Sequence, residues 1–288
     1  QVIKLQYKKS IKVIKINLIG KIQLRNMLMA ILAAKNSNLG LDKIFEVIPK
    51  IKSVEGRFER IGKIKNNSKV ILDYAHTPEA LKTCILNLRE QFKEKRICVL
   101  FGCGGNRDQN KRFQMGKIVS DYSDKIYLTD DNPRFENPEK IRRDVKKGIK
   151  NQKLFEISDR SIAIFKAIQN LDSGEILLVA GKGHEKIQDL GKKKIYFSDK
   201  KIIFDAIKKK NQKLSNNLKL NILKEQSGNQ RLPLIPSFKH VRINSKEVKK
   251  NDVFFAIRGK NKDGNKFVNQ AFKNGASIAV VNKIQQKF

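Results

Sequence analysis

The chain has 288 residues, and its 62 Lys and Arg against 28 Asp and Glu give a formal net charge of +34. This length predicts about two domains, and a hydrophobic fraction of 40% excludes an entirely disordered basic tail. No apolar run is long enough to span a bilayer, and Cys84, Cys98 and Cys103 form no CxxC pair. We therefore expect a cytoplasmic protein without a membrane span, a disulfide framework or a zinc site.

The two ends of the sequence indicate a piece of a longer protein. The chain opens Gln1-Val2-Ile3, without an initiator methionine or the pattern of a signal peptide. It stops at Phe288 within an unfinished α/β pattern. We expect an interior fragment.

Apolar periodicity predicts the elements in chain order. Residues 11–19 predict a strand and residues 23–36 a helix. From about residue 50 to 210, strands at 70–74, 97–102, 125–130 and 175–181 alternate with helices at about 78–93, 111–121, from 138, 160–170 and 199–210. Such alternation predicts an α/β fold with a Rossmann-like, mostly parallel sheet and helices on both faces.

The alternating pattern of strands and helices stops after residue 210. Residues 211–236 are polar, with a Ser-Gly-Asn step and two prolines, and indicate a linker. A new α/β pattern begins near residue 237, with a helix at about 265–274 and an apolar run at 276–282. We expect a partial, small α/β domain there.

Four polar or glycine-rich loops follow the predicted strands of the larger domain. They read DYAHTP from Asp73, GCGGNRD from Gly102, DNPRFENP from Asp131 and GKGHE from Gly181. Ligands of open α/β sheets bind beyond the carboxyl ends of the strands, so these loops predict one shared site.

The residue types in these loops suit an amphoteric small molecule. Arg107 and Arg134 offer planar forks for carboxylates, whereas Asn132 and Glu185 can accept hydrogen bonds from an ammonium group. Gly181 would let the backbone approach the ligand. Cys103 is expected to be a small buried residue rather than a nucleophile.

The four loops carry a resemblance to a known family. DYAHTPEAL, FGCGGNRDQNKR, TDDNPRFENP and VAGKGHE resemble, in order and spacing, the C-terminal domain of the Mur ligases, and within that family its MurE branch. The segment LIGKIQLRN from residue 18 resembles the last helix of the family's central domain. We therefore assign 1–48 to the end of a central ATPase domain, 49–210 to the C-terminal amino-acid-binding domain, 211–236 to a linker and 237–288 to a partial N-terminal UDP-binding domain.

The resemblance implies an activity and a ligand. This branch uses ATP to convert a carboxylate of UDP-MurNAc-L-Ala-D-Glu to an acyl phosphate, which the amine of an amino acid attacks. By similarity, Arg107, Asn132, Arg134, Gly181 and Glu185 would bind that amino acid. Lysine would leave Arg134 unpaired in a closed site, so the arginine favours meso-diaminopimelate.

The resemblance also implies contacts to ATP from Asn26, Arg57, Asp73 and His76. The sequence holds no GxxxxGK[ST] loop, and Gly181-Lys182-Gly183 does not fit that spacing. We expect the phosphate loop and the Mg²⁺ ligands upstream of residue 1, no catalytic or metal-binding residue in this fragment, and no turnover by the fragment alone.

The last part of the chain resembles another branch, MurF. There the usual Asp-Ser-Arg reads Asn244-Ser245-Lys246, Gly-Asp reads Asn251-Asp252 and Asp-Gly-His reads Asp263-Gly264-Asn265. The order suggests a fusion of the two branches, with the UDP-binding half altered.

Three other classes of protein share some of these features. A folylpolyglutamate-synthetase-like ligase shares the architecture but not the DNPR and GKGHE loops. A Rossmann dehydrogenase needs a GxGxxG after its first strand, which is missing. A basic nucleic-acid-binding protein remains an alternative. However, the lysines are spread along the chain without a recognised motif, and they predict a solvated surface rather than a specific site.

Overall fold

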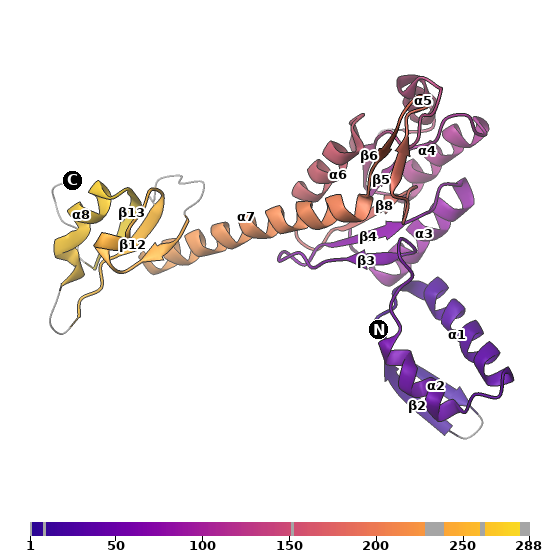
Figure 1. Ribbon diagram of the computed structural model, residues 1–288, viewed down its shortest axis with the longest axis horizontal. Coiled ribbons are helices and arrows are strands. Elements are labelled where there is room, and N and C mark those ends of the chain that lie inside the picture. The colour runs from indigo at the N-terminus through magenta and orange to yellow at the C-terminus, as the bar shows by residue number, and fades with distance from the viewer. Residues whose placement is uncertain (1, 8–9, 151–152, 228–238, 260–262, 283–288) are drawn as a thin grey trace. The chain divides into compact units, whose positions relative to one another are not determined.

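The computed structural model describes residues 2–7, 10–150, 153–227, 239–259 and 263–282. The chain divides into two compact units, residues 1–210 and 211–288 (Figure 1). Within the described residues, no helix is both long and apolar enough to cross a membrane.

The first unit begins with a small α/β layer. Its elements are an antiparallel hairpin and two helices, namely β1 (Val2–Tyr7), β2 (Ser10–Lys15), α1 (Gly20–Asn36) and α2 (Leu41–Val47). The strand predicted at residues 11–19 is too long, because β2 ends at Lys15. Ile16 and Leu18 keep the alternating apolar pattern beyond the strand because they are buried against α1 and α2.

A six-stranded sheet forms the centre of the unit. Its strand order is β3-β4-β8-β5-β6-β7, and every neighbouring pair is parallel except β3 with β4. The strands are β3 (Glu59–Ile61), β4 (Lys69–Asp73), β5 (Ile97–Phe101), β6 (Lys125–Leu128), β7 (Lys153–Glu156) and β8 (Ile176–Ala180). The predicted α/β class with a mostly parallel sheet is confirmed.

Helices cover both faces of this sheet (Figure 1). One apolar core joins alternate strand residues to α3 (Pro78–Gln91), α4 (Asn110–Tyr122) and α5 (Pro138–Lys146). The other face carries α6 (Arg160–Gln169), which contacts β5, β6 and β8, and α7 (Asp199–Ser227) beside it. Thr77 caps α3 ahead of Pro78, and Asp159 caps α6, as their sequence positions predict.

Helix α7 changes one prediction. Residues 211–227, which we assigned to a linker, continue α7, and residues 228–236 lie outside the described part of the chain. A separate antiparallel hairpin, β9 (Ile187–Asp189) with β10 (Lys194–Tyr196), lies between β8 and α7 in sequence.

The second unit holds a three-stranded parallel sheet in the order β11-β12-β13. Its elements are β11 (Val241–Arg242), β12 (Asp252–Phe255), β13 (Ala276–Val280) and the short helix α8 (Val268–Lys273). Val248, Phe254 and Ala271 belong to its apolar core.

The unusual residues of this unit fit its backbone. Asn251, where the related motif has glycine, adopts a φ of 70°, a left-handed conformation that asparagine tolerates. Asn244, in place of aspartate, still caps the following turn by accepting a hydrogen bond from Lys246 N. Asn265, in place of histidine, donates to Asp263 Oδ1 at 2.6 Å. These substitutions therefore preserve the local turns.

Candidate functional site

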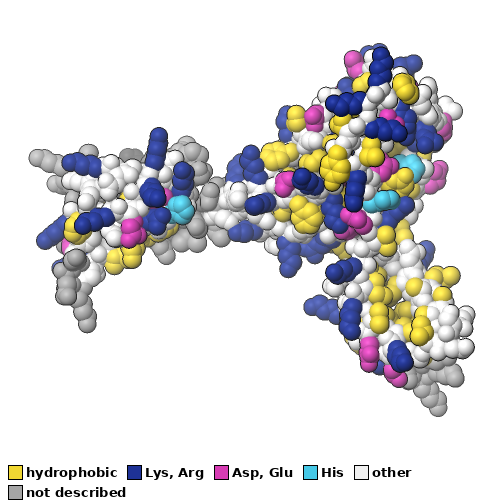
Figure 2. Space-filling view, viewed as in Figure 1, with side chains coloured by type: hydrophobic (Ala, Val, Ile, Leu, Met, Phe, Trp, Pro, Cys, Tyr) yellow, Lys and Arg dark blue, Asp and Glu magenta, His cyan; other side chains and the backbone are white. Residues whose placement is uncertain are grey.

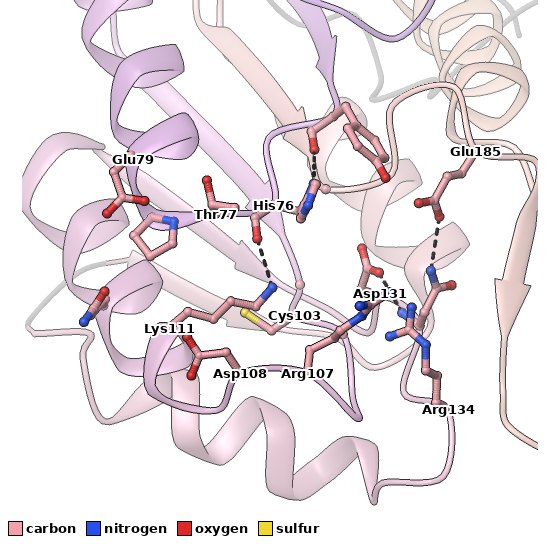
Figure 3. A pocket seen from close by; sticks show the side chains of 17 residues that line it. His76, Thr77, Glu79, Cys103, Arg107, Asp108, Lys111, Asp131, Arg134 and Glu185 are labelled. Carbon is pink, nitrogen blue, oxygen red and sulfur yellow. Dashed lines mark hydrogen bonds between the residues drawn. The ribbon is translucent and has the colours of Figure 1, made fainter.

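A cavity of about 640 Å³ lies at the carboxyl ends of β4, β5, β6 and β8. In the view of Figure 3, Asp131, Arg134 and Glu185 lie toward one end, and Thr77, Glu79, Asp108 and Lys111 toward the other. All five residues predicted to bind the amino acid line this cavity, together with His76: they are Arg107, Asn132, Arg134, Gly181 and Glu185.

Two glycines let the strand-end loops meet. A Cβ atom on Gly105 would lie 2.0 Å from Pro133 O, and Gly105 N donates to Asn132 O at 2.9 Å. Gly181 has a φ of +113°, and a Cβ there would lie 2.8 Å from Asp131 Oδ2. Any side chain at these positions would separate the loops that form the cavity.

Arg134 is held from two directions. Its Nη1 donates to Gly105 O at 2.7 Å, and its backbone N donates to Asp189 O at 3.0 Å. Its backbone has a φ of 52°, which is uncommon for a residue with a side chain. The guanidinium is therefore fixed against the neighbouring loop, and its side chain remains 25% exposed.

A buried arginine, Arg112, helps to join the loop after β5 to the loop after β6. Arg112 is fully buried, and its Nη2 and Nη1 donate to Glu136 Oε2 at 2.8 Å and to Asp144 Oδ2 at 3.3 Å. Glu136 also accepts from Asn106 N, and Asn106 Oδ1 accepts from Phe135 N. The hydrogen bond from Arg112 holds the pKa of Glu136 below its ordinary value.

Lys182 is a residue whose role the sequence did not reveal. Its side chain is fully buried, and Nζ donates to Glu185 Oε2, Asn132 Oδ1 and Ile187 O. Burial pushes the pKa of Glu185 up, but the hydrogen bond and charge of Lys182, together with hydrogen bonds from Asn132 and Tyr74, outweigh burial, so this pKa is lower than usual. Glu185 is thereby kept as a carboxylate on the cavity wall.

Asp131 is a second residue that the sequence analysis did not select. It lines the cavity, its Oδ1 accepts from Asn132 N at 2.8 Å, and its buried Oδ2 has no hydrogen-bond partner among the described residues. The sequence feature that could have identified Asp131 as a site residue is its position directly before Asn132, after the end of a strand.

Two of the four predicted ATP contacts meet at Tyr74. The exposed guanidinium of Arg57 lies over the Tyr74 ring at 4.4 Å, and the His76 ring contacts it at 4.6 Å. Asp73 is buried below them, and its two carboxylate oxygens accept from the backbone N of Phe58 and Ala75, both at 2.7 Å. Its visible role is to hold the loop.

The fourth predicted contact, Asn26, is exposed on α1 and does not line the cavity. On the same helix, Gln23 is buried and donates to Arg57 O at 2.7 Å. Gln23 therefore connects α1 to the segment that carries Arg57.

Cys103 lines the cavity and is buried, and burial raises the pKa of its thiol to about 12, which disfavours the reactive thiolate. Within the described residues, no group of three or more His, Cys, Asp or Glu side chains could hold a metal ion. Figure 2 shows Lys and Arg spread over the visible face of both units rather than gathered in one stripe.

Comparison with known families defines the class of protein. Residues 56–183 match the family described as Mur ligase, glutamate ligase domain, and residues 237–287 match Mur ligase family, catalytic domain. The chain therefore carries domains of the Mur ligase family, as the four strand-end motifs predicted.

Individual relatives narrow the comparison. The chain is 42% identical over 188 residues to a UDP-N-acetylmuramoyl-L-alanyl-D-glutamate–2,6-diaminopimelate ligase of Rickettsia felis, covering 65% of this chain and 35% of the relative. A ligase of the same name from Fusobacterium nucleatum is 43% identical over 201 residues, covering 69% of this chain and 41% of the relative. The chain thus spans well under half the length of these relatives.

A solved structure of the same kind of ligase gives a similar result. It superimposes with a TM-score of 0.58 at 31% sequence identity, and the match covers 72% of this chain and 42% of that one. These relatives are ligases of the MurE branch, which is the branch that the motifs predicted.

Proposed function

We propose that the chain is part of an ATP-dependent acid–amino-acid ligase of peptidoglycan precursor synthesis. In this proposal, residues 49–210 hold meso-diaminopimelate for addition to UDP-MurNAc-L-Ala-D-Glu. The observation that supports this proposal most directly is the charge of the cavity lining. Two arginines, Arg107 and Arg134, line the same cavity as two carboxylates, Asp131 and Glu185. Meso-diaminopimelate has two carboxylates and two ammonium groups, so its charges complement these four side chains.

Specificity would come from the second carboxylate. Lysine has the same length of chain between its amines but lacks that group, so one guanidinium would have no carboxylate of the ligand to pair with. The loss of a charged partner in a closed site costs about 1–3 kcal/mol or more. Arg134 is the better candidate for this contact, because it is held rigidly by Gly105 O and Asp189 O.

The nucleotide contacts extend the proposal. Arg57 and His76 are exposed beside Tyr74 and would face ATP, and Asp73 would support them by fixing the backbone of the loop. Asn26 on α1 would contact the adenine. ATP would be bound together with Mg²⁺.

The domain assignment is also a proposal. Large apolar side chains of residues 1–48 are exposed, and α1 and α2 border an apolar hollow of about 280 Å³. Such a surface supports its assignment to a larger central ATPase domain. The exposed side chains are Val2, Ile11, Val13, Leu28, Met29 and Leu32. Residues 237–288 would be a MurF-like UDP-binding domain, and the enzyme would work in the cytoplasm.

Ligand-dependent unfolding tests the proposed function. A ligand that binds only the folded state raises stability by about 1.4 kcal/mol at ten times its dissociation constant. The melting temperature of the full chain should rise with meso-diaminopimelate and not with equal concentrations of L-lysine. Arg134→Gln should remove this difference. Equal shifts with both amino acids, or no shift with either, would contradict the proposal.

A further inference from the structure

Arg160 lies beneath the cavity without lining it. It is the first residue of α6 and is fully buried, as is Asp199, the first residue of α7. Its Nε and Nη2 donate to the two carboxylate oxygens of Asp199 at 2.9 and 2.6 Å. Asp199 therefore fixes the plane of the guanidinium with a bidentate pair.

The rest of the guanidinium reaches two walls of the cavity. Nη2 also donates to Ala180 O at 2.9 Å, directly before Gly181. Nη1 lies 3.9 Å from Asp131 Oδ2, and neither atom has a hydrogen-bond partner among the described residues. The two charges attract each other, yet the carboxylate oxygen is not occupied by a donor.

This arrangement solves a physical problem of the site. A buried carboxylate without a counter-charge is strongly disfavoured. A direct hydrogen bond from a protein donor, however, would occupy the carboxylate oxygen that a ligand would need. Burial lowers the pKa of Arg160, but Asp199 first and Asp131 after it outweigh burial and hold that pKa above its ordinary value. Gly181 lies so close to this carboxylate that a Cβ atom there would be 2.8 Å from Asp131 Oδ2.

We propose that Arg160, clamped by Asp199, is a positioning residue that sets a fixed positive charge beside Asp131 and leaves Asp131 Oδ2 without a hydrogen bond from the described residues, as the acceptor for an ammonium group of the amino acid. This inference rests on the proposed function. In this inference, the buried pair of Arg160 and Asp199 affects only the contact between Asp131 and an ammonium group. The other contacts of the ligand depend on Arg107, Arg134 and Glu185.

Analogues that lack one amine separate positioning from general structural support. The dissociation constants of meso-diaminopimelate, L-2-aminopimelate and D-2-aminopimelate are measured by calorimetry on the full chain. The folded chain should prefer the diamine over one of the two analogues by at least tenfold. Arg160→Gln and Asp131→Asn should both abolish that preference, while the affinity for that analogue changes less than threefold.

Two further variants keep the test decisive. Arg160→Lys retains the charge and should restore part of the preference. Asp199→Asn should let Arg160 turn toward Asp131 and should therefore also reduce the preference for the diamine. This variant keeps the test possible if Arg160→Gln fails to fold. Lys210→Met is the matched control, since Lys210 is buried and donates to Gln169 O and Leu171 O at the end of α6. It should destabilise the fold and leave the preference intact.

The outcomes distinguish the two claims. If the unsubstituted chain binds none of the three ligands, the proposed function fails and the inference fails with it. If the chain binds the diamine and the Arg160 and Asp199 variants weaken all three ligands equally, the inference alone is overturned.

Discussion

Lys182 Nζ lies 2.8 Å from Glu185 Oε2, and the lysine side chain that carries it is fully buried. Burial of an ammonium is tolerated because each of its three donors has an acceptor, the other two being Asn132 Oδ1 and Ile187 O. One side chain thus ties the loop after β8 to the loop after β6. The carboxylate of Glu185 gains a fixed position at the edge of the cavity.

Replacement of Lys182 should be costly. Lys182→Met removes the three hydrogen bonds of a buried ammonium, one of which is an ion pair with the partly exposed Glu185. We expect a loss of about 3 kcal/mol in the free energy of unfolding, measured by urea denaturation. Lys200→Met is the control, because Lys200 forms a partly exposed pair with Glu59 at 2.9 Å and should cost less than about 1 kcal/mol. Similar losses from the two variants would show that the buried network is not special.

The pair of Arg112 and Glu136 predicts a pH dependence. The folded-state pKa of Glu136 lies below its ordinary value of 4.5, so its contribution is complete above pH 4.5 and is lost as the pH falls through the folded-state pKa. Arg112→Met should therefore destabilise the chain most at pH 7, and the difference from the unsubstituted chain should shrink toward pH 3. Urea titrations at several pH values measure this, and a difference independent of pH would contradict it.

Close packing of the loops predicts a contrast between two glycines. Gly105→Ala would place a Cβ atom 2.0 Å from Pro133 O, and we expect it to destabilise the chain by about 1–3 kcal/mol. Gly40→Ala meets nothing within 4 Å and has an ordinary φ, so its effect should stay within about 0.5 kcal/mol. Thermal unfolding of both variants checks the contrast. Equal effects would mean that the loop after β5 can move away.

Arg107 allows function and stability to be separated. It is exposed and makes no hydrogen bond or ion pair with the described residues, so Arg107→Gln should change stability by less than about 0.5 kcal/mol. Because it lines the cavity, the same change should weaken meso-diaminopimelate severalfold. Arg143→Gln, on the exposed surface of α5, should leave both quantities unchanged. Unchanged ligand affinity in Arg107→Gln would remove this arginine from the site.

Much of the fold followed from local patterns. The buried strands β5 and β8 are continuous apolar runs, and α3 and α6 begin at their expected caps, so pattern and capping both identified them. Strand β7, KLFE, was not predicted, because it is only four residues long and mostly exposed at the edge of the sheet. The end of α7 was missed because polar residues 211–227 suit a helix as well as a linker.

The site was predictable only in part, and charge pairing explains why. Loop position and residue type selected Arg134 and Glu185, which line the cavity. Lys182, Arg160 and Asp199 are charged residues that the sequence marks as surface, and only their partners make burial possible. Arg160 and Asp199 are 39 residues apart, and Lys182 is 3 residues from Glu185 but 50 from Asn132. Local sequence therefore does not reveal the pairing of Arg160 with Asp199 or of Lys182 with Asn132.

A titration of the isotope-labelled full chain, followed by backbone amide NMR, tests the central claim most directly. Meso-diaminopimelate should shift amides in three loops, at residues 102–107, 131–134 and 181–185, and leave the second unit unchanged. L-lysine at the same concentrations should produce much smaller shifts at these positions. Shifts of equal size with both amino acids, or shifts outside these loops alone, would contradict the assignment of this cavity to the amino acid.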